Sequence, residues 1–184
     1  MKFFQNRAVA VILAVIVVLG TLAVSAVRFA GSCRKTEEAF FSVSQGKAPV
    51  YYVDQIIGAA ASLADVGEKY EQLSDAAASM RDVRRALVRA EEARDISDIY
   101  DACMQVSDAA RDFDAQADEV TMSGYDAELT ADCVSEIAGA IRSVEESGYN
   151  ASVSRFMAEK YSSFPASLYA RWFSIAAPEP FAPA

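Results

Sequence analysis

The sequence predicts an all-α protein, in which one N-terminal hydrophobic helix is followed by an antiparallel up-and-down helical bundle. Three observations lead to this prediction. Apolar residues recur three and four residues apart over most of the chain after residue 50. Glycine and proline, which mark the many turns of a sheet protein, number only 8 and 5 in 184 residues. The first apolar run holds 20 residues without a charge, which is the length of a membrane-spanning helix.

Residues 1–7 form a short basic N-terminus, and residues 8–27 form the uncharged run. As a helix this run would be ~30 Å long, which matches the hydrocarbon core of a bilayer. We therefore expect a single-pass transmembrane anchor at 8–27, in a cell membrane. The same segment also fits a cleaved signal peptide, with Val24-Ser25-Ala26 as the cleavage site, which would yield a secreted bundle.

The charges that flank the apolar run do not separate the two orientations. Lys2 and Arg7 stand before it, and Arg28, Arg34 and Lys35 follow it. We expect the bundle on the extracytoplasmic side, because a short N-terminus followed by an acidic C-terminal domain is readily exported in that way.

Residues 28–49 are expected to form a short helix that continues from the anchor, and then a linker. Residues 33–43 have helical character, and the sequence Ser44-Gln45-Gly46-Lys47-Ala48-Pro49 interrupts it. At the other end of the chain, residues 175–184 are rich in proline and have no apolar period. We expect a flexible tail there.

Residues 50–174 are expected to form the bundle, from three long helices that each bury one apolar stripe. The middle stripe keeps its spacing without a miss, from Ile96 to Val120. The first stripe changes phase at 72–75, which is compatible with one bent helix or with two helices. Short connections make neighbouring helices antiparallel, and Asp126 is a candidate cap for the last helix. The expected helices span 50–91, 95–120 and 127–164, and the connections are 46–49, 91–94 and 121–126.

The composition argues against an enzyme, a metalloprotein and a nucleic-acid-binding protein. The chain has no histidine, the commonest general base and metal ligand. Residues 28–184 carry 15 basic and 26 acidic groups, and so acidic a surface repels nucleic acid. The carboxylates lie off the apolar stripes, so we interpret them as solvated. We expect no catalytic residue, no cofactor and no bound metal.

Cys103 and Cys133 lie on the apolar stripes of successive helices. Antiparallel packing about the 121–126 turn would place them ~16 Å apart along the bundle at 1.5 Å per residue, which is too far for a disulfide. We expect two buried free thiols.

A spaced motif near the C-terminus consists of Tyr149-Asn150, Val153 and Phe164-Pro165. In identity and spacing these residues resemble the closing signature of the LemA family. The plan of a short basic N-terminus, one hydrophobic helix and a helical bundle is also similar to that family.

Two features depart from the family pattern. Phe156-Met157 stands where the family has a second Tyr-Asn pair, and the basic stretch that follows the family's anchor is absent. The chain is thus similar to a divergent member. The resemblance implies a bacterial, single-pass helical protein, and because the family's biochemical role is not established, it supplies no catalytic residue.

The chemistry of the motif residues favours structural roles. Tyr149 can place its ring in the core, and Asn150 can hydrogen-bond a neighbouring helix or the tail. Phe164-Pro165 would end the last helix on its buried stripe and direct the tail, and Arg171-Trp172-Phe173 is apolar enough to pack on the end of the bundle.

The leading functional hypothesis is a membrane-tethered interaction or scaffold module without chemistry of its own, which binds a protein partner or itself. The alternative is an extracytoplasmic sensor or ligand-binding bundle. No second apolar run of 18 residues follows residue 28, so a sensor would need a partner chain to carry its signal across the membrane.

Overall fold

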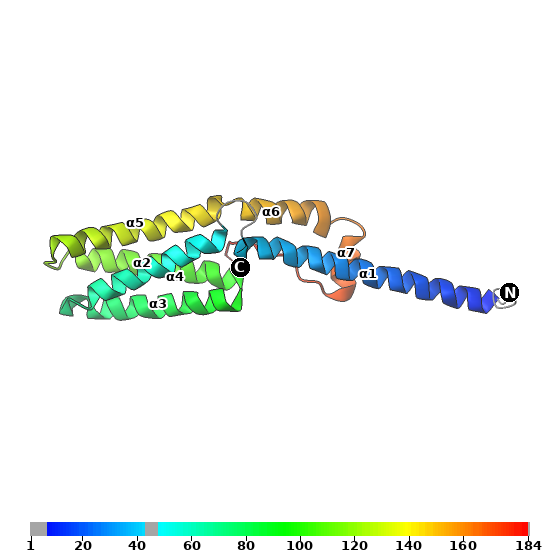
Figure 1. Cartoon of the computed structure of the whole chain (residues 1–184), viewed down its shortest axis with the longest axis horizontal. Helices are drawn as coiled ribbons and strands as arrows, with labels where there is room; N and C mark the ends of the chain where they lie inside the picture. Colours follow the sequence, from blue (N-terminus) through cyan, green and yellow to red (C-terminus); the bar gives the residue numbers. More distant parts are fainter. Residues whose placement is uncertain (1–6, 43–47, 184) are drawn as a thin grey trace. The chain divides into compact units, whose positions relative to one another are not determined.

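The computed structural model describes residues 7–42 and 48–183, and within these ranges it contains helices and no strand. The all-α prediction is confirmed. The expected break at 44–49 lies mostly outside the described residues. In chain order the elements are α1 (Arg7–Phe41), α2 (Pro49–Gly67), a 3-10 turn η2 (Glu71–Leu73), α3 (Ser74–Ala93), α4 (Ile96–Ala117), α5 (Gly124–Glu146), α6 (Tyr149–Phe156), a π-helical turn η3 (Met157–Tyr161) and α7 (Ala166–Phe173) (Figure 1).

The chain divides into two compact units, which are described separately. The anchor unit comprises Met1–Glu38 and Ser154–Pro178, and the bundle unit comprises Ala39–Val153 and Glu179–Ala184. We expected residues 50–174 to form one bundle and 175–184 to form a free tail. Instead, the segment 154–178 belongs with the anchor helix, and the chain end belongs with the bundle.

In the bundle unit, α2, α3, α4 and α5 form an antiparallel up-and-down bundle (Figure 1). Each helix packs against the next one in the chain, and α5 returns to pack against α2. The connections at 68–73, 94–95 and 118–123 are short, which is why chain neighbours are also neighbours in space.

The segment 50–91, for which one bent helix or two helices were possible, forms two helices. The bundle therefore has four long helices rather than three. α2 ends at Gly67, and α3 begins at Ser74 in the opposite direction. A Cβ added to Gly67 would lie 2.8 Å from Ala77 Cβ and 2.8 Å from Phe113 Cε2. Glycine is thus required where the end of α2 crosses α3 and α4 at close range.

The core follows the predicted stripes closely in α4. Every stripe residue from Ile96 to Ala117 is buried, and Val120 lies beyond the helix end. Asp95 caps α4, because its carboxylate accepts a hydrogen bond of 2.9 Å from the Asp98 amide.

The prediction of one helix over 127–164 was wrong. α5 ends at Glu146, and Gly148 has a φ of +80°, a left-handed conformation that interrupts the helix. Val144, Tyr149 and Val153 are buried on both sides of this break. The apolar spacing therefore continues across an interruption of the backbone, and spacing alone could not reveal it.

Candidate functional site

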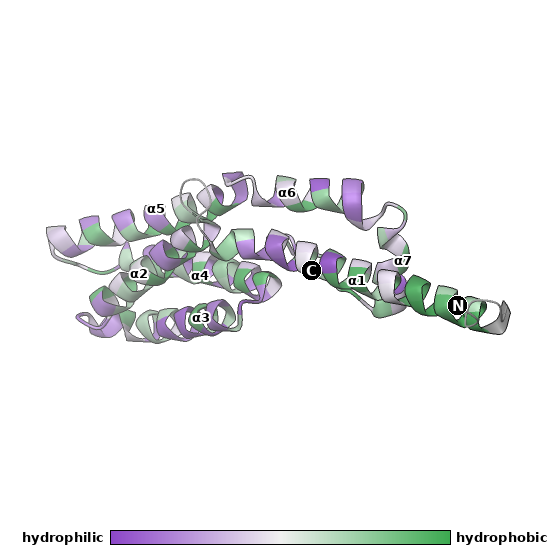
Figure 2. Cartoon of the chain, turned by 45° about the vertical axis from the view of Figure 1, so that its right-hand side comes forward, coloured by the Kyte–Doolittle hydropathy of each residue, from purple (hydrophilic) through white to green (hydrophobic). Residues whose placement is uncertain are grey.

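α1 is long and apolar enough to cross a membrane. Figure 2 shows that its N-terminal part is the most hydrophobic stretch of the chain. Val11 and Leu19 are 61% and 60% exposed. Such large apolar side chains are stable in that position only when lipid or protein surrounds them.

The Tyr149-Asn150 pair binds the end of the chain within the bundle unit. The Tyr149 hydroxyl donates a hydrogen bond of 2.6 Å to the carbonyl oxygen of Glu179. Asn150 Nδ2 donates to the Phe181 carbonyl oxygen at 2.9 Å, and Asn150 Oδ1 accepts from the Phe181 amide at 2.8 Å. The side-chain amide therefore satisfies both backbone groups of Phe181. These contacts to the tail are of the kind that we expected.

The Phe181 ring lies in the core, where only 2% of the residue is exposed. Its centroid is 5.8 Å from that of Phe40 and 5.1 Å from that of Tyr100, and Phe40 also lies 5.1 Å from Tyr149. The prediction of a flexible tail was therefore wrong at residues 179–183. One buried ring and three hydrogen bonds to its backbone hold this segment, which has no apolar period.

The motif is divided between the two units. Val153 is buried beside the pair in α6, whereas Phe164 and Pro165 belong to the anchor unit. Phe164 is 81% exposed, so its expected place on a buried stripe was wrong. Pro165 immediately precedes α7, so it does not lead into the tail. The tail begins after α7, where Ser174 has a left-handed conformation (φ 48°).

Arg171-Trp172-Phe173, which we expected to pack on the end of the bundle, belongs to the anchor unit instead. These residues form the last turn of α7 in the anchor unit. Trp172 and Phe173 are 63% and 49% exposed. The helix instead buries Tyr169, and its aromatic end is left uncovered.

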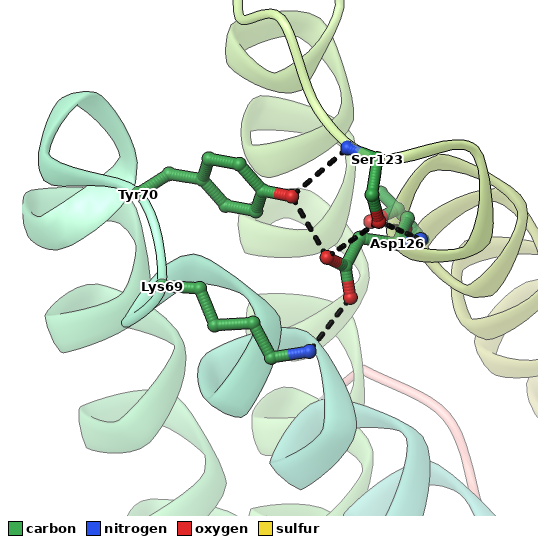
Figure 3. Close-up of polar contacts among 5 residues, drawn as sticks. Lys69, Tyr70, Ser123 and Asp126 are labelled. Carbon is green, nitrogen blue, oxygen red and sulfur yellow. Dashed lines mark hydrogen bonds and ion pairs between the residues drawn. The ribbon is translucent and has the colours of Figure 1, made fainter.

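A second polar cluster surrounds Asp126 at the start of α5 (Figure 3). Lys69 Nζ donates to Oδ1 at 2.7 Å. The hydroxyls of Tyr70 and Ser123 both donate to Oδ2, at 2.7 and 2.8 Å. Three side chains from two connections of the bundle thus converge on one carboxylate, and they join the end of α2 to the beginning of α5.

Backbone groups complete the cluster around Asp126. The Ser123 amide donates to the Tyr70 hydroxyl at 3.0 Å, and the Asp126 amide donates to Ser123 Oγ at 3.1 Å. Ser123 is therefore the cap of α5, and Asp126 occupies the third helical position, which corrects our expectation that Asp126 caps. The Ser-x-x-Asp spacing of a capping box was visible in the sequence, but the approach of Lys69 and Tyr70 was not.

The hydrogen bonds from Lys69, Tyr70 and Ser123 lower the pKa of Asp126 from 3.8 to about 2. The residue is only 7% exposed. A carboxylate that is ionised at neutral pH and already accepts three side-chain hydrogen bonds is poorly suited to act as a general base. The arrangement is suited to holding two connections together.

Cys103 and Cys133 are buried free thiols, as predicted. Burial raises the pKa of Cys103 to about 12, which keeps it as an unreactive thiol at neutral pH. In the described part of the chain, no group of three or more Cys, Asp and Glu side chains is placed to hold a metal ion.

The exposed face of α3 carries a row of arginines in an otherwise acidic bundle. Arg81, Arg85 and Arg89 recur every four residues and so share one side of the helix. Arg85 and Arg89, together with Arg84 from the adjoining face, line a surface groove. Arg81 and Arg85 form ion pairs with Glu68 and Asp82. Within the described residues, no hydrogen-bond acceptor reaches the buried Nε of Arg84.

No protein-family model, curated protein or solved structure matches this chain.

Proposed function

We propose that the chain is a membrane-anchored, non-enzymatic helical bundle of the LemA-like type that serves as an interaction or scaffold module. One observation carries the proposal. The apolar helix α1 is exposed, while the polar clusters of the bundle bind other parts of the same bundle. The side chain of Asp126 is hydrogen-bonded to residues of two connections, and that of Asn150 is hydrogen-bonded to the C-terminal segment. Neither side chain is therefore free to act on a substrate.

The LemA-like assignment rests on the sequence motif and on the plan of one apolar helix followed by a helical bundle. The positions of Tyr149 and Asn150 add a physical reason for that motif. Both side chains hydrogen-bond the C-terminal segment and hold it on the bundle. In this chain, a Tyr-Asn pair and a distant aromatic residue, Phe181, together fix that segment.

We place the bundle on the extracytoplasmic side of a cell membrane. Support comes from its acidity, since the bundle unit holds 23 Asp and Glu against nine Lys and Arg. Protease added to intact cells should then digest the bundle and leave a fragment of the anchor. Full protection that is lost only after lysis would place the bundle inside the cell.

The arginine row on α3 favours a partner with an acidic surface. Most of the bundle is itself acidic, so a second copy of the chain offers such a surface. Self-association through the α3 row and the acidic helices of a neighbouring copy is the interaction that we propose. The attraction would come mainly from exposed charges, which salt screens, so added salt should weaken the self-association.

Sedimentation of the full-length protein in detergent micelles tests this interaction. We expect association at low salt that decreases as salt is added. Replacing Arg85 and Arg89 with Gln should weaken the association. The matched control replaces Arg111 and Arg142 with Gln, which removes the same charge from α4 and α5. A monomer at every salt concentration, or equal effects of both double variants, would contradict self-association through α3.

A further inference from the structure

The two units differ sharply in charge. The anchor unit holds eight Lys and Arg against three Asp and Glu. Lys2 and Arg7 precede the apolar run, and the part of the unit that follows the run, residues 28–38 and 154–178, has six against three, a net charge of +3. The bundle unit, with nine against 23, has a net charge of −14. A basic surface next to an apolar helix is attracted to anionic lipid headgroups, whereas an acidic one is repelled.

The C-terminal part of the anchor unit lies against α1 where the apolar run ends. The Phe29 ring, two residues after Val27, lies 6.3 Å from that of Phe156 and 5.7 Å from that of Tyr161. Ala26 is 4% exposed, in contrast to Val27, which is 72% exposed. One side of α1 is therefore covered at the level where the helix would leave the hydrocarbon core.

α7 is held at this same level. The Tyr161 hydroxyl donates a hydrogen bond of 2.8 Å to the carbonyl oxygen of Ile175, directly after the end of α7. Figures 1 and 2 both show α7 beside α1. Tyr161 thus connects the ring contact on α1 to the segment that follows α7.

The ends of α7 present aromatic side chains to the surroundings. Phe164 precedes the helix and is 81% exposed, and Trp172 and Phe173 in its last turn are 63% and 49% exposed. Arg171 lies beside them and is exposed. Tryptophan next to a basic residue, on a short helix beside the end of a spanning helix, is the composition of an interfacial anchor.

We propose that α7 is a membrane-interface element, which inserts Trp172 and Phe173 among lipid headgroups while α1 spans the bilayer. This inference rests on the proposed anchoring by α1. The occupant of the aromatic surface is lipid, because the surface adjoins the apolar run and the unit that carries it is basic. Two attachments in one unit would restrict the tilt and rotation of the anchor helix more than α1 alone.

Trp172 is the only tryptophan of the chain, so its fluorescence reports on α7 directly. The full-length protein is reconstituted into phosphatidylcholine vesicles that contain phosphatidylglycerol, with bromine on the acyl chains either near the headgroup or near the chain end. We expect blue-shifted emission and stronger quenching by the shallow bromines than by the deep ones.

The control moves the tryptophan to the bundle. A Trp172→Phe/Tyr125→Trp variant places it at a site that is 71% exposed in the bundle unit, where we expect water-like emission and no quenching. The proposal would be overturned if Trp172 were not quenched. It would also be overturned if the tryptophans at positions 172 and 125 were quenched equally. A blue shift without quenching would mean that protein, and not lipid, covers α7, and would overturn it as well.

Flotation of the same vesicles separates this proposal from the anchoring itself. If the protein floats with the vesicles and Trp172 is not quenched, only the role of α7 is wrong. If the protein fails to float, the anchor proposal is wrong and the interfacial role fails with it.

Discussion

Asn150 shows how one side chain can fix a segment that has no secondary structure of its own. Its amide satisfies the N–H and the C=O of Phe181, and the Phe181 ring then fills a space between Phe40 and Tyr100. Because buried backbone groups must be paired, the ring could not enter the core without a partner of this kind.

We predict that Asn150→Ala lowers the free energy of unfolding by about 1–2 kcal/mol, since it removes two hydrogen bonds. Chemical denaturation of the full-length protein in micelles, followed by circular dichroism, measures the change. In a chain that ends at Pro178 the same substitution should have almost no effect, because its partner is absent. An equal loss in both chains would show that Asn150 acts without the tail. The exposed Gln72→Ala serves as a control.

Asp126 gives the bundle a specific response to acid. Its folded pKa of about 2 lies below its ordinary value of 3.8. The stabilisation from its hydrogen bonds is therefore fully present above pH 3.8 and is lost as the pH falls toward 2. We predict that the wild-type protein loses more stability over this range than Asp126→Asn, which cannot titrate there. Parallel slopes in a pH series of denaturation curves would contradict this role.

At the scale of the helices, Gly67 and Gly58 lie in the same element but in different surroundings. A Cβ at Gly67 would meet Ala77 and Phe113 at 2.8 Å, whereas one at Gly58 would meet nothing within 4 Å. Gly67→Ala should destabilise the bundle by about 1–3 kcal/mol through overpacking. Gly58→Ala should stabilise it by about 0.5–1 kcal/mol through helix propensity. Thermal melts of the two variants provide the comparison, and a Gly67→Ala variant as stable as wild type would refute the close crossing of helices there.

The sequence predicted the helices well where one apolar stripe runs without a break, as in α4. It left α2 and α3 undecided, because the change of phase at 72–75 does not show whether the chain bends or reverses. The helix break at Gly148 was missed, since the buried spacing of Val144, Tyr149 and Val153 continues across it.

The polar clusters show a different limit of sequence reasoning. The motif pair at Tyr149-Asn150 was found, because residue type and position suggested a contact with the tail. The Asp126 cluster was not, because Lys69 and Tyr70 precede it by 57 and 56 residues. Only the packing of α5 on α2 brings these groups together, and no local pattern carries that information.

At the scale of the whole molecule, the chain combines a basic unit that contains the apolar helix with an acidic bundle. The C-terminal segment contributes to both, since 154–178 belongs with α1 and 179–184 belongs with the bundle. Cleavage after Ala26 would remove most of the apolar run but leave the Phe29 contacts with Phe156 and Tyr161. The retention of residues 8–27 therefore decides between an anchored and a secreted protein.

The intact mass of the protein recovered from membranes after an alkaline carbonate wash tests the anchoring most directly. If α1 anchors the protein, the protein stays in the membrane pellet and its mass includes residues 8–27. A protein released by the wash, with a mass that begins at Val27, would contradict this anchoring and identify the N-terminal segment as a signal peptide.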